Sequence, residues 1–343
     1  MPNFFPTQTK VSPSFTEPEL IVTYAQASGA FSALQGGKPR VKIGSDDLYV
    51  YINALDMRTD AQASQASSQF LPSATLIGNY HQTATYLIRT RAIWDRHDMA
   101  AAARYSIGLP AAQDLAQRAG IYQQMRTGLL YGFSPSKGEG LLNTVGATSV
   151  TLPADSYGNT TVTAYDNGEM AMFILQQVVA MKTRMFQSGA NIKNKVVIIS
   201  PQRVFMSMTY SNIVQVVQYQ RPGAGTATTG QVIQNVVEEM GDEIEWYYDD
   251  TLIGKGANGA DAVLMTIPEV EQPDIAGINT NVFADVSQSM KAVNLMYADM
   301  AAPIKIPTPT PDGAITEIQE LRVSSGWCVR PQGITILNMP YES

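Results

Sequence analysis

The sequence of 343 residues is poor in the side chains that carry most enzyme and metal chemistry, with one cysteine and two histidines. The lone Cys328 excludes an intramolecular disulfide, and its place beside Trp327 in a strand-like segment predicts a buried, inert thiol. Neither His81 nor His97 has a cysteine or a second histidine at the spacing of metal ligands. No nucleophile, zinc or dinucleotide motif accompanies them. We therefore expect no catalytic residues, no metal and no cofactor, and a protein that is not an enzyme.

Charged residues are also scarce, because they make up 15% of the chain against ~25% in a typical soluble domain. Gln, Asn, Ser and Thr take their place, and a surface of neutral polar groups is easily desolvated, which favours extensive protein–protein contact. A soluble enzyme with few charges is an equal alternative on composition alone. The net charge of −7 argues against a surface that binds phosphates, since such a surface needs clustered Lys and Arg.

Long apolar runs are missing as well. None approaches the ~20 residues that span a bilayer, so we expect no membrane contact. Residues 1–5 have neither a basic start nor a long apolar core, and no signal peptide is expected. Residues 1–45 are rich in Pro, Ser, Thr and Gly, which leaves too little apolar surface for a core of their own. We expect them to form an arm that neighbouring molecules order.

Two alternating segments predict a long β-hairpin. Val50 lies between Tyr49 and Tyr51 in the first segment, and residues 80–89 alternate in the second. The stretch between them is mostly Ala, Ser, Gln and Thr. A two-stranded hairpin is marginally stable alone, so we expect another copy of the protein to complete it. Aromatic and apolar groups dominate interfaces, although packing within the same subunit is an equal alternative. The expected anchors are Tyr49, Tyr51, Phe70 and Leu71.

Helical and strand patterns continue along the chain. One apolar stripe predicts a helix that begins near Pro110, a residue suited to the first helical turn. A second stripe predicts a helix that ends near Gly189, and residues 196–200 read as a buried strand followed by a helix at 202–208. Later segments predict a helix and two strands at 243–248 and 261–267. The stripes consist of Leu115, Ala119, Tyr122, Met125 and Leu129; of Met170, Ile174, Val178, Met181 and Met185; and of Val232, Val236 and Met240.

The order of these elements resembles a known family. The first long helix runs into Leu-Leu-Tyr-Gly at 129–132, and a short loop leads to Gly-Leu-Leu-Asn at 140–143. This series resembles the spine helix and following turn of tailed-bacteriophage major capsid proteins. Residues 326–336 resemble the closing strands of that family. The resemblance covers nearly the whole chain in order and implies an α+β architecture, the Hong Kong phage 97-like capsid fold.

The resemblance also implies five parts. They are an N-terminal arm at 1–45, an extended loop or β-hairpin at 46–92, a peripheral domain with the spine helix at 93–144, an axial α/β domain at 145–305, and return strands of the peripheral domain at 306–343.

As a function, the resemblance implies a capsid protein that joins itself in hexamers and pentamers. These would close into an icosahedral shell around the double-stranded DNA of a tailed phage or prophage, without sequence-specific DNA binding. Assembly in the bacterial host cytoplasm, a location in the virion, and separate scaffolding, portal and decoration or cement proteins are implied too. No lysine lies between Lys42 and Lys137, so the hairpin lacks the amine that the family's founding member uses for isopeptide cross-links. An encapsulin-like nanocompartment and an α/β enzyme with an unrecognised site are the alternatives.

Overall fold

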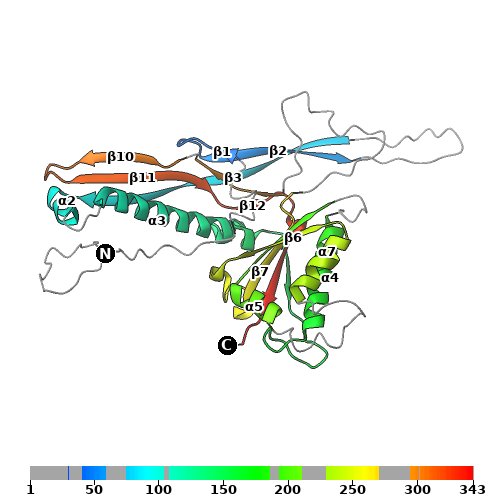
Figure 1. The fold of residues 1–343 in the computed structure, drawn as a ribbon. Helices are drawn as coiled ribbons and strands as arrows, with labels where there is room; N and C mark the ends of the chain where they lie inside the picture. The colour runs from blue at the N-terminus through cyan, green and yellow to red at the C-terminus, as the bar shows by residue number, and fades with distance from the viewer. Residues whose placement is uncertain are drawn as a thin grey trace, which may run out of the picture.

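The computed structural model of the chain describes residue 30 and residues 41–58, 75–103, 108–185, 193–210, 229–269, 294–300 and 302–342. These residues form an elongated unit and a compact unit, which meet where the long helix α3 ends (Figure 1).

The elongated unit is a six-stranded sheet in the order β1-β9-β11-β3-β2, with β10 also paired to β11. Its long strands are β3 (Thr75–Trp94) and β11 (Ile315–Ser324), which are antiparallel. Helix α3 (Leu109–Tyr131) lies along one face, and α2 (Arg96–Ala103) lies near the start of α3 (Figure 1). The remaining strands are β1 (Val41–Lys42), β2 (Tyr49–Arg58), β9 (Ala298–Asp299) and β10 (Ile304–Pro309).

Strand β3 changes its partner halfway along its length. Residues 75–84 pair with β2, and residues 85–94 pair with β11. The hairpin expected from the alternating segments is therefore present, but its second strand continues without a break into the sheet beneath α3. Beyond the end of β11, β2 and β3 extend as a two-stranded ribbon, defined here as residues 49–58 and 75–84 (Figure 1).

Helix α3 begins at Leu109 with Pro110 in its first turn, as the sequence predicts. The predicted apolar stripe is confirmed near the end of the helix, where Leu129 is buried and Met125 packs against the core, and it is wrong at Leu115 and Tyr122, which are 45% and 36% exposed. The sheet is instead faced by buried residues that include Gln117 and Ile121. The Gln117 side-chain Nε2 donates to the backbone carbonyl of Glu317 (3.3 Å), which satisfies its buried donor, whereas its Oε1 is buried without a hydrogen-bond partner among the described residues.

The compact unit contains a five-stranded sheet in the order β4-β13-β7-β5-β6. The pairs β4–β13 and β5–β6 are parallel, whereas β13–β7 and β7–β5 are antiparallel. A separate two-stranded sheet joins β8 to β12. The strands are β4 (Thr148–Thr151), β5 (Lys195–Ser200), β6 (Glu243–Tyr248), β7 (Asp261–Thr266), β8 (Leu295–Met296), β12 (Trp327–Cys328) and β13 (Ile334–Met339). The helices are α4 (Asn167–Arg184), α5 (Gln202–Tyr210) and α7 (Thr229–Glu239), with short 3-10 turns η2 (Pro135–Lys137), η3 (Leu141–Asn143), η5 (Asp250–Leu252), η6 (Ala257–Gly259) and η8 (Pro331–Gly333).

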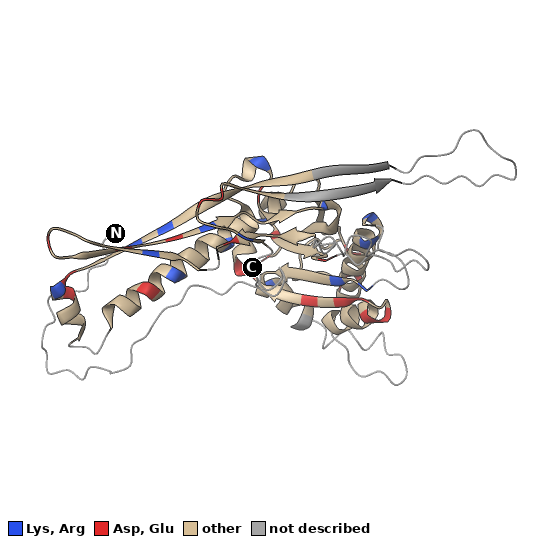
Figure 2. Ribbon diagram, turned by 90° about the horizontal axis from the view of Figure 1, so that it is seen from above, with Lys and Arg blue, Asp and Glu red and all other residues tan. Residues whose placement is uncertain are grey.

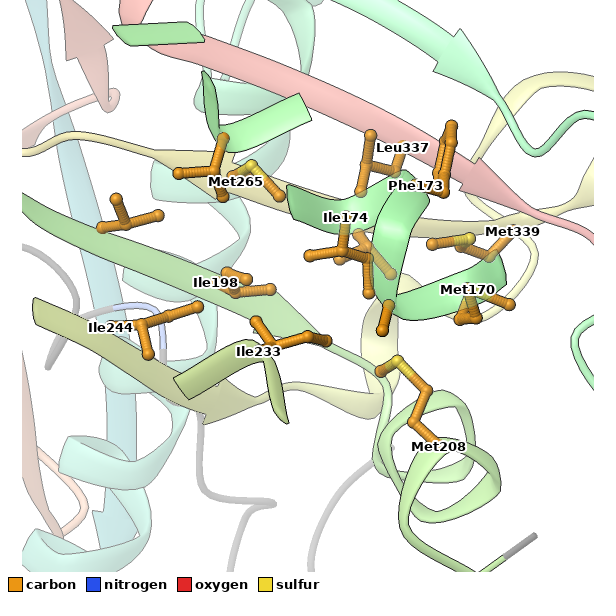
Figure 3. Close-up of a cluster of buried hydrophobic side chains, with 14 of the residues drawn as sticks. Met170, Phe173, Ile174, Ile198, Met208, Ile233, Ile244, Met265, Leu337 and Met339 are labelled. Carbon is orange, nitrogen blue, oxygen red and sulfur yellow. The ribbon is translucent and has the colours of Figure 1, made fainter. Parts of the chain in front are cut away.

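Both faces of the five-stranded sheet are buried. On one face, Ile198 and Met265 point toward Ile174 of α4 and Ile233 of α7 (Figure 3). On the other face, a second cluster joins strand residues such as Ile199 to the end of α3 and to η3. Strands buried on both faces read as continuous apolar runs, which explains the sequence of β5.

The predicted helices and strands of this unit are confirmed. All five members of the α4 stripe are buried, and the strands at 243–248 and near 261–267 are β6 and β7. Helix α7 is present, and the predicted stripe is partly correct: Met240 packs against the core, whereas Val232 is exposed and the buried positions are Ile233 and Val237. Helix α4 ends at Arg184, and Gly189 lies outside the described residues.

The closing segment is divided between the two units. Strand β11 belongs to the sheet beside α3, whereas β13 lies between β4 and β7 of the other sheet. Its side chains are almost all buried, so β13 completes the core of the compact unit.

The turn after α3 requires glycine at positions 132 and 140, where the two backbone segments are in direct contact. Gly132 and Gly140 both have positive φ (75° and 87°), and a Cβ on either would lie 2.3 Å from backbone atoms near the other. The Asn143 side chain donates to the Tyr131 carbonyl (2.7 Å), and the Gly140 N–H donates to the Gly326 carbonyl (3.0 Å). The Leu-Tyr-Gly and Gly-Leu-Leu-Asn segments thus form the joint between the two units.

Candidate functional site on the two-stranded ribbon

Three tyrosines line one face of the ribbon. Tyr49 pairs with Ala84, Tyr51 with Gln82, and Tyr80 with Asn53, and paired residues point to the same side of an antiparallel sheet. The ring centroids are 6.3 Å apart for Tyr49 and Tyr51, and 6.1 Å apart for Tyr51 and Tyr80. The three side chains are 52%, 59% and 62% exposed. We call Tyr49, Tyr51 and Tyr80 the tyrosine ladder.

The ladder continues a face that is buried farther along β3. Tyr86 and Ile88 have the same orientation, and there they pack against Phe133, which follows α3, and Ile121 of α3. The Tyr86 ring lies 4.8 Å from Phe133, and its hydroxyl donates to Glu139 (2.8 Å). Burial, and then the contact with Glu139, raises the pKa of Tyr86. Helix α3 ends before it reaches the ladder, so an apolar face that it covers elsewhere is left open on the ribbon.

Two of the four predicted anchors can be placed. Tyr49 and Tyr51 lie on the ladder, whereas Phe70 and Leu71 fall outside the described residues. The prediction omitted Tyr80, although it belongs to the second alternating segment. Only the strand register puts it beside Tyr51, and no pattern within one strand gives that register.

The exposed ladder is suited to burying aromatic surface against another molecule. Tyrosine combines a large apolar ring with a hydroxyl that finds a partner at the edge of an interface. Among the described residues, no third strand or helix covers this face of the two-stranded ribbon.

The expected burial of Cys328 is only partial. Burial raises the pKa of its thiol to about 12, and the sulfur lies 2.9 Å from the Asn294 side-chain oxygen. Within the described residues, no group of three or more His, Cys, Asp and Glu is placed to hold a metal. His81 lies on β3 and His97 on α2.

Charges are scattered over the described parts of both units, with Lys and Arg set among Asp and Glu (Figure 2). Arg89 pairs with Glu320 (2.7 Å), and Lys305 pairs with Asp114 (2.5 Å). Among the helices that the structure describes, none combines the length and apolar character needed to cross a bilayer.

Comparison with known proteins identifies the fold. Neither a protein-family model nor a curated protein sequence matches the chain. Among solved structures, the capsid of the Myoviridae phage XM1 aligns with a TM-score of 0.66 at 10% identity, covering 95% of this chain and 96% of that one. A structure from Mycobacterium phage Bobi gives 0.57 at 8% identity (97% and 96%), and the capsid of an empty GTA particle gives 0.55 at 10% (96% and 95%). The chain therefore has the α+β Hong Kong phage 97-like capsid fold.

Proposed function

We propose that this chain is the major capsid protein of a tailed double-stranded DNA phage or prophage. Copies of it join in hexamers and pentamers and close into an icosahedral shell. The observation that carries this proposal is the ribbon, which extends beyond its own sheet with an uncovered tyrosine ladder, in a chain whose fold is that of phage capsids.

Assembly would work through many modest contacts. Each ribbon lies over an adjacent copy, with Tyr49, Tyr51 and Tyr80 as anchors, and each subunit both gives and receives such a contact. Once a subunit is held at one contact, the next forms within the same lattice at high effective concentration, so the closed shell is far more stable than any single contact.

The proposal gives each part of the chain a role in the shell. Residues 1–45 serve as an arm and residues 46–92 as the extended loop. Residues 93–144 with 306–343 form the peripheral part, and residues 145–305 form the axial part, except that β9 and the start of β10 lie in the sheet beside α3 and β13 joins the axial sheet. Separate scaffolding, portal and decoration or cement proteins would act with the shell, which encloses DNA without reading its sequence in a virion assembled in the host cytoplasm.

The direct test is the mass of the purified, full-length protein. We expect megadalton particles by sedimentation and round shells by negative-stain microscopy. A small oligomer with no larger species under any assembly condition would contradict the proposal and favour an enzyme.

A variant with a shortened ribbon tests the mechanism. Asp56 and Ile77 are directly paired, so replacing residues 57–76 by Asn-Gly closes the strands with a two-residue turn. The subunit should stay folded, with an unchanged circular dichroism spectrum, and should not form closed shells. Normal shells from this variant would refute the role of the extended loop.

The alternative of an encapsulin-like nanocompartment shares this fold, and the contents of the particles distinguish it from a phage capsid. Particles from infected or induced cells should contain phage DNA, whereas enzyme cargo without DNA would favour the alternative.

A further inference from the structure

One arginine makes hydrogen bonds at the root of the ribbon, which is the point near Thr85 where β3 changes its partner from β11 to β2. Arg322 lies on β11 opposite Leu87 of β3, on the sheet face away from α3 and from the tyrosine ladder. Its Nε donates to the Ser45 carbonyl oxygen (2.5 Å), and its Nη1 donates to the Thr85 hydroxyl oxygen (3.1 Å) and, at longer range, to the Asp47 carbonyl oxygen (3.5 Å). One guanidinium therefore ties the turn before β2 to β3 and β11.

Thr85 completes this attachment. Its side chain is 9% exposed, and its hydroxyl donates to the Asp47 carbonyl oxygen (2.5 Å). Its backbone N–H donates to the Leu48 carbonyl (3.0 Å). The turn itself is closed by the Gly44 N–H, which donates to the Asp47 carboxylate (2.6 Å). Since Thr85 is the point at which β3 exchanges β11 for β2, these bonds lie at the hinge between sheet and ribbon.

A small rotation at this hinge produces a large displacement at the far end. Residues 75–84 of β3 are hydrogen-bonded to β2 and are not paired with β11. Ten extended residues span about 33 Å, so a rotation of about 5° at the root moves the end of the strand by about 3 Å. Side chains are in contact only when their heavy atoms lie within about 4.5 Å of each other. A shift of about 3 Å at the end of the ribbon therefore changes which residues it contacts on another molecule.

The groups that accept hydrogen bonds from Arg322 are two carbonyl oxygens and a hydroxyl oxygen, all of them neutral. The shape of the guanidinium, rather than its charge, therefore decides which hydrogen bonds form. A guanidinium is a planar fork with donors in fixed directions, whereas a lysine ammonium is a single flexible point. Lysine at this position keeps the charge and loses the simultaneous contact with Ser45 and Thr85.

We propose that Arg322 is a positioning residue that sets the direction of the ribbon and thereby selects the geometry in which subunits join. The inference rests on the proposed function, because it requires that the ribbon contacts a second copy. It assigns to Arg322 control over the size and uniformity of the shell, beyond the stability of the subunit.

The test compares Arg322→Lys with Arg89→Lys. Arg89 lies on the same sheet face, and its pair with Glu320 does not involve the root. In the full-length subunit, Arg322→Lys should speed amide hydrogen exchange around residues 45–50 and 83–87 at least tenfold, with little change in melting temperature. On assembly it should give particles of mixed or altered diameter by electron microscopy, while Arg89→Lys gives particles of the original diameter.

Thr85 provides an independent pair of variants. Thr85→Val removes the hydroxyl and should alter particle diameter in the same way as Arg322→Lys, whereas Thr85→Ser retains it and should not. If Arg322→Lys fails to fold, the Thr85 pair alone decides the question. Original-diameter particles from Arg322→Lys or from Thr85→Val would overturn the positioning role. Failure of the unaltered protein to assemble at all would instead overturn the proposed function.

Discussion

Removing one ring of the tyrosine ladder should weaken assembly by an amount that its exposure predicts. Tyr51 is 59% exposed in the isolated subunit. A buried tyrosine covers roughly 200 Å², so covering the open part of Tyr51 removes about 120 Å² from water. At about 25 cal/mol per Å² this is worth about 3 kcal/mol. It is an upper limit, since ordering the interface opposes it.

The assay is the critical concentration for shell formation, followed by light scattering or sedimentation over a dilution series. Each 1.4 kcal/mol corresponds to a factor of about ten, so Tyr51→Ala should raise the critical concentration by up to about 100-fold. Tyr51→Phe keeps the ring and should change it by less than tenfold.

The matched control is Tyr157→Ala. Tyr157 is 80% exposed but lies in the loop before α4, away from the ribbon. The reasoning is refuted if the triple variant of Tyr49, Tyr51 and Tyr80 to alanine assembles at the original concentration. An equal effect of Tyr157→Ala would show that exposed tyrosines in general, rather than the ladder, govern assembly.

Two further predictions concern the subunit itself. Gly326→Ala should lower the free energy of unfolding by about 1–3 kcal/mol in urea titrations, because its Cβ would lie 2.5 Å from the Leu129 carbonyl oxygen. Gly230→Ala, in α7 with open space around it, should be neutral or stabilising, and the idea fails if the two variants behave alike. Burial raises the pKa of Asp299 to about 6 against the opposing charge of Lys42. The folded protein then holds this proton up to a higher pH than the unfolded chain, so stability falls as pH rises from about 4 to about 6. Asp299→Asn should remove that loss and raise stability at pH 8 by the order of 1 kcal/mol, after allowance for partial exposure, with little effect near pH 4. Melting temperatures with equal pH dependence in both proteins would contradict this.

The sequence predicts an element well where apolar residues alone define its buried face. Helix α4 is such a case, since Met170, Ile174 and Val178 all lie in the core. Helix α3 is the opposite case. Its face on the sheet includes Gln117, and Leu115 points outward, so a stripe drawn through apolar residues holds at Leu129 and fails in the first half of the helix. The existence of the helix follows from local preference, whereas its buried face depends on distant residues, through the hydrogen bond from Gln117 to Glu317 two hundred residues away and through the packing of Ile121 with Leu321.

Long-range pairing limits what could be predicted of the site. The alternation of Tyr49 and Tyr51 indicates a strand, and the hairpin follows from two such strands. That β3 is one continuous strand with two successive partners depends on β11, which lies far along the chain. The same applies to β13, whose place between β4 and β7 is set by three-dimensional packing. The ladder's third member and the hinge at Thr85 follow from these pairings.

Strand β10 has a consequence for how copies can join. It is exposed along its whole length at the margin of the sheet, and it carries Pro307 and Pro309 two residues apart. Prolines are tolerated in a sheet where their nitrogen points away from the ladder, so both interrupt the row of donors that β10 would offer to an incoming strand. Strand β10 therefore cannot pair along its whole length with a strand of another molecule through backbone hydrogen bonds. Fibrous growth by sheet extension is thereby disfavoured along this edge.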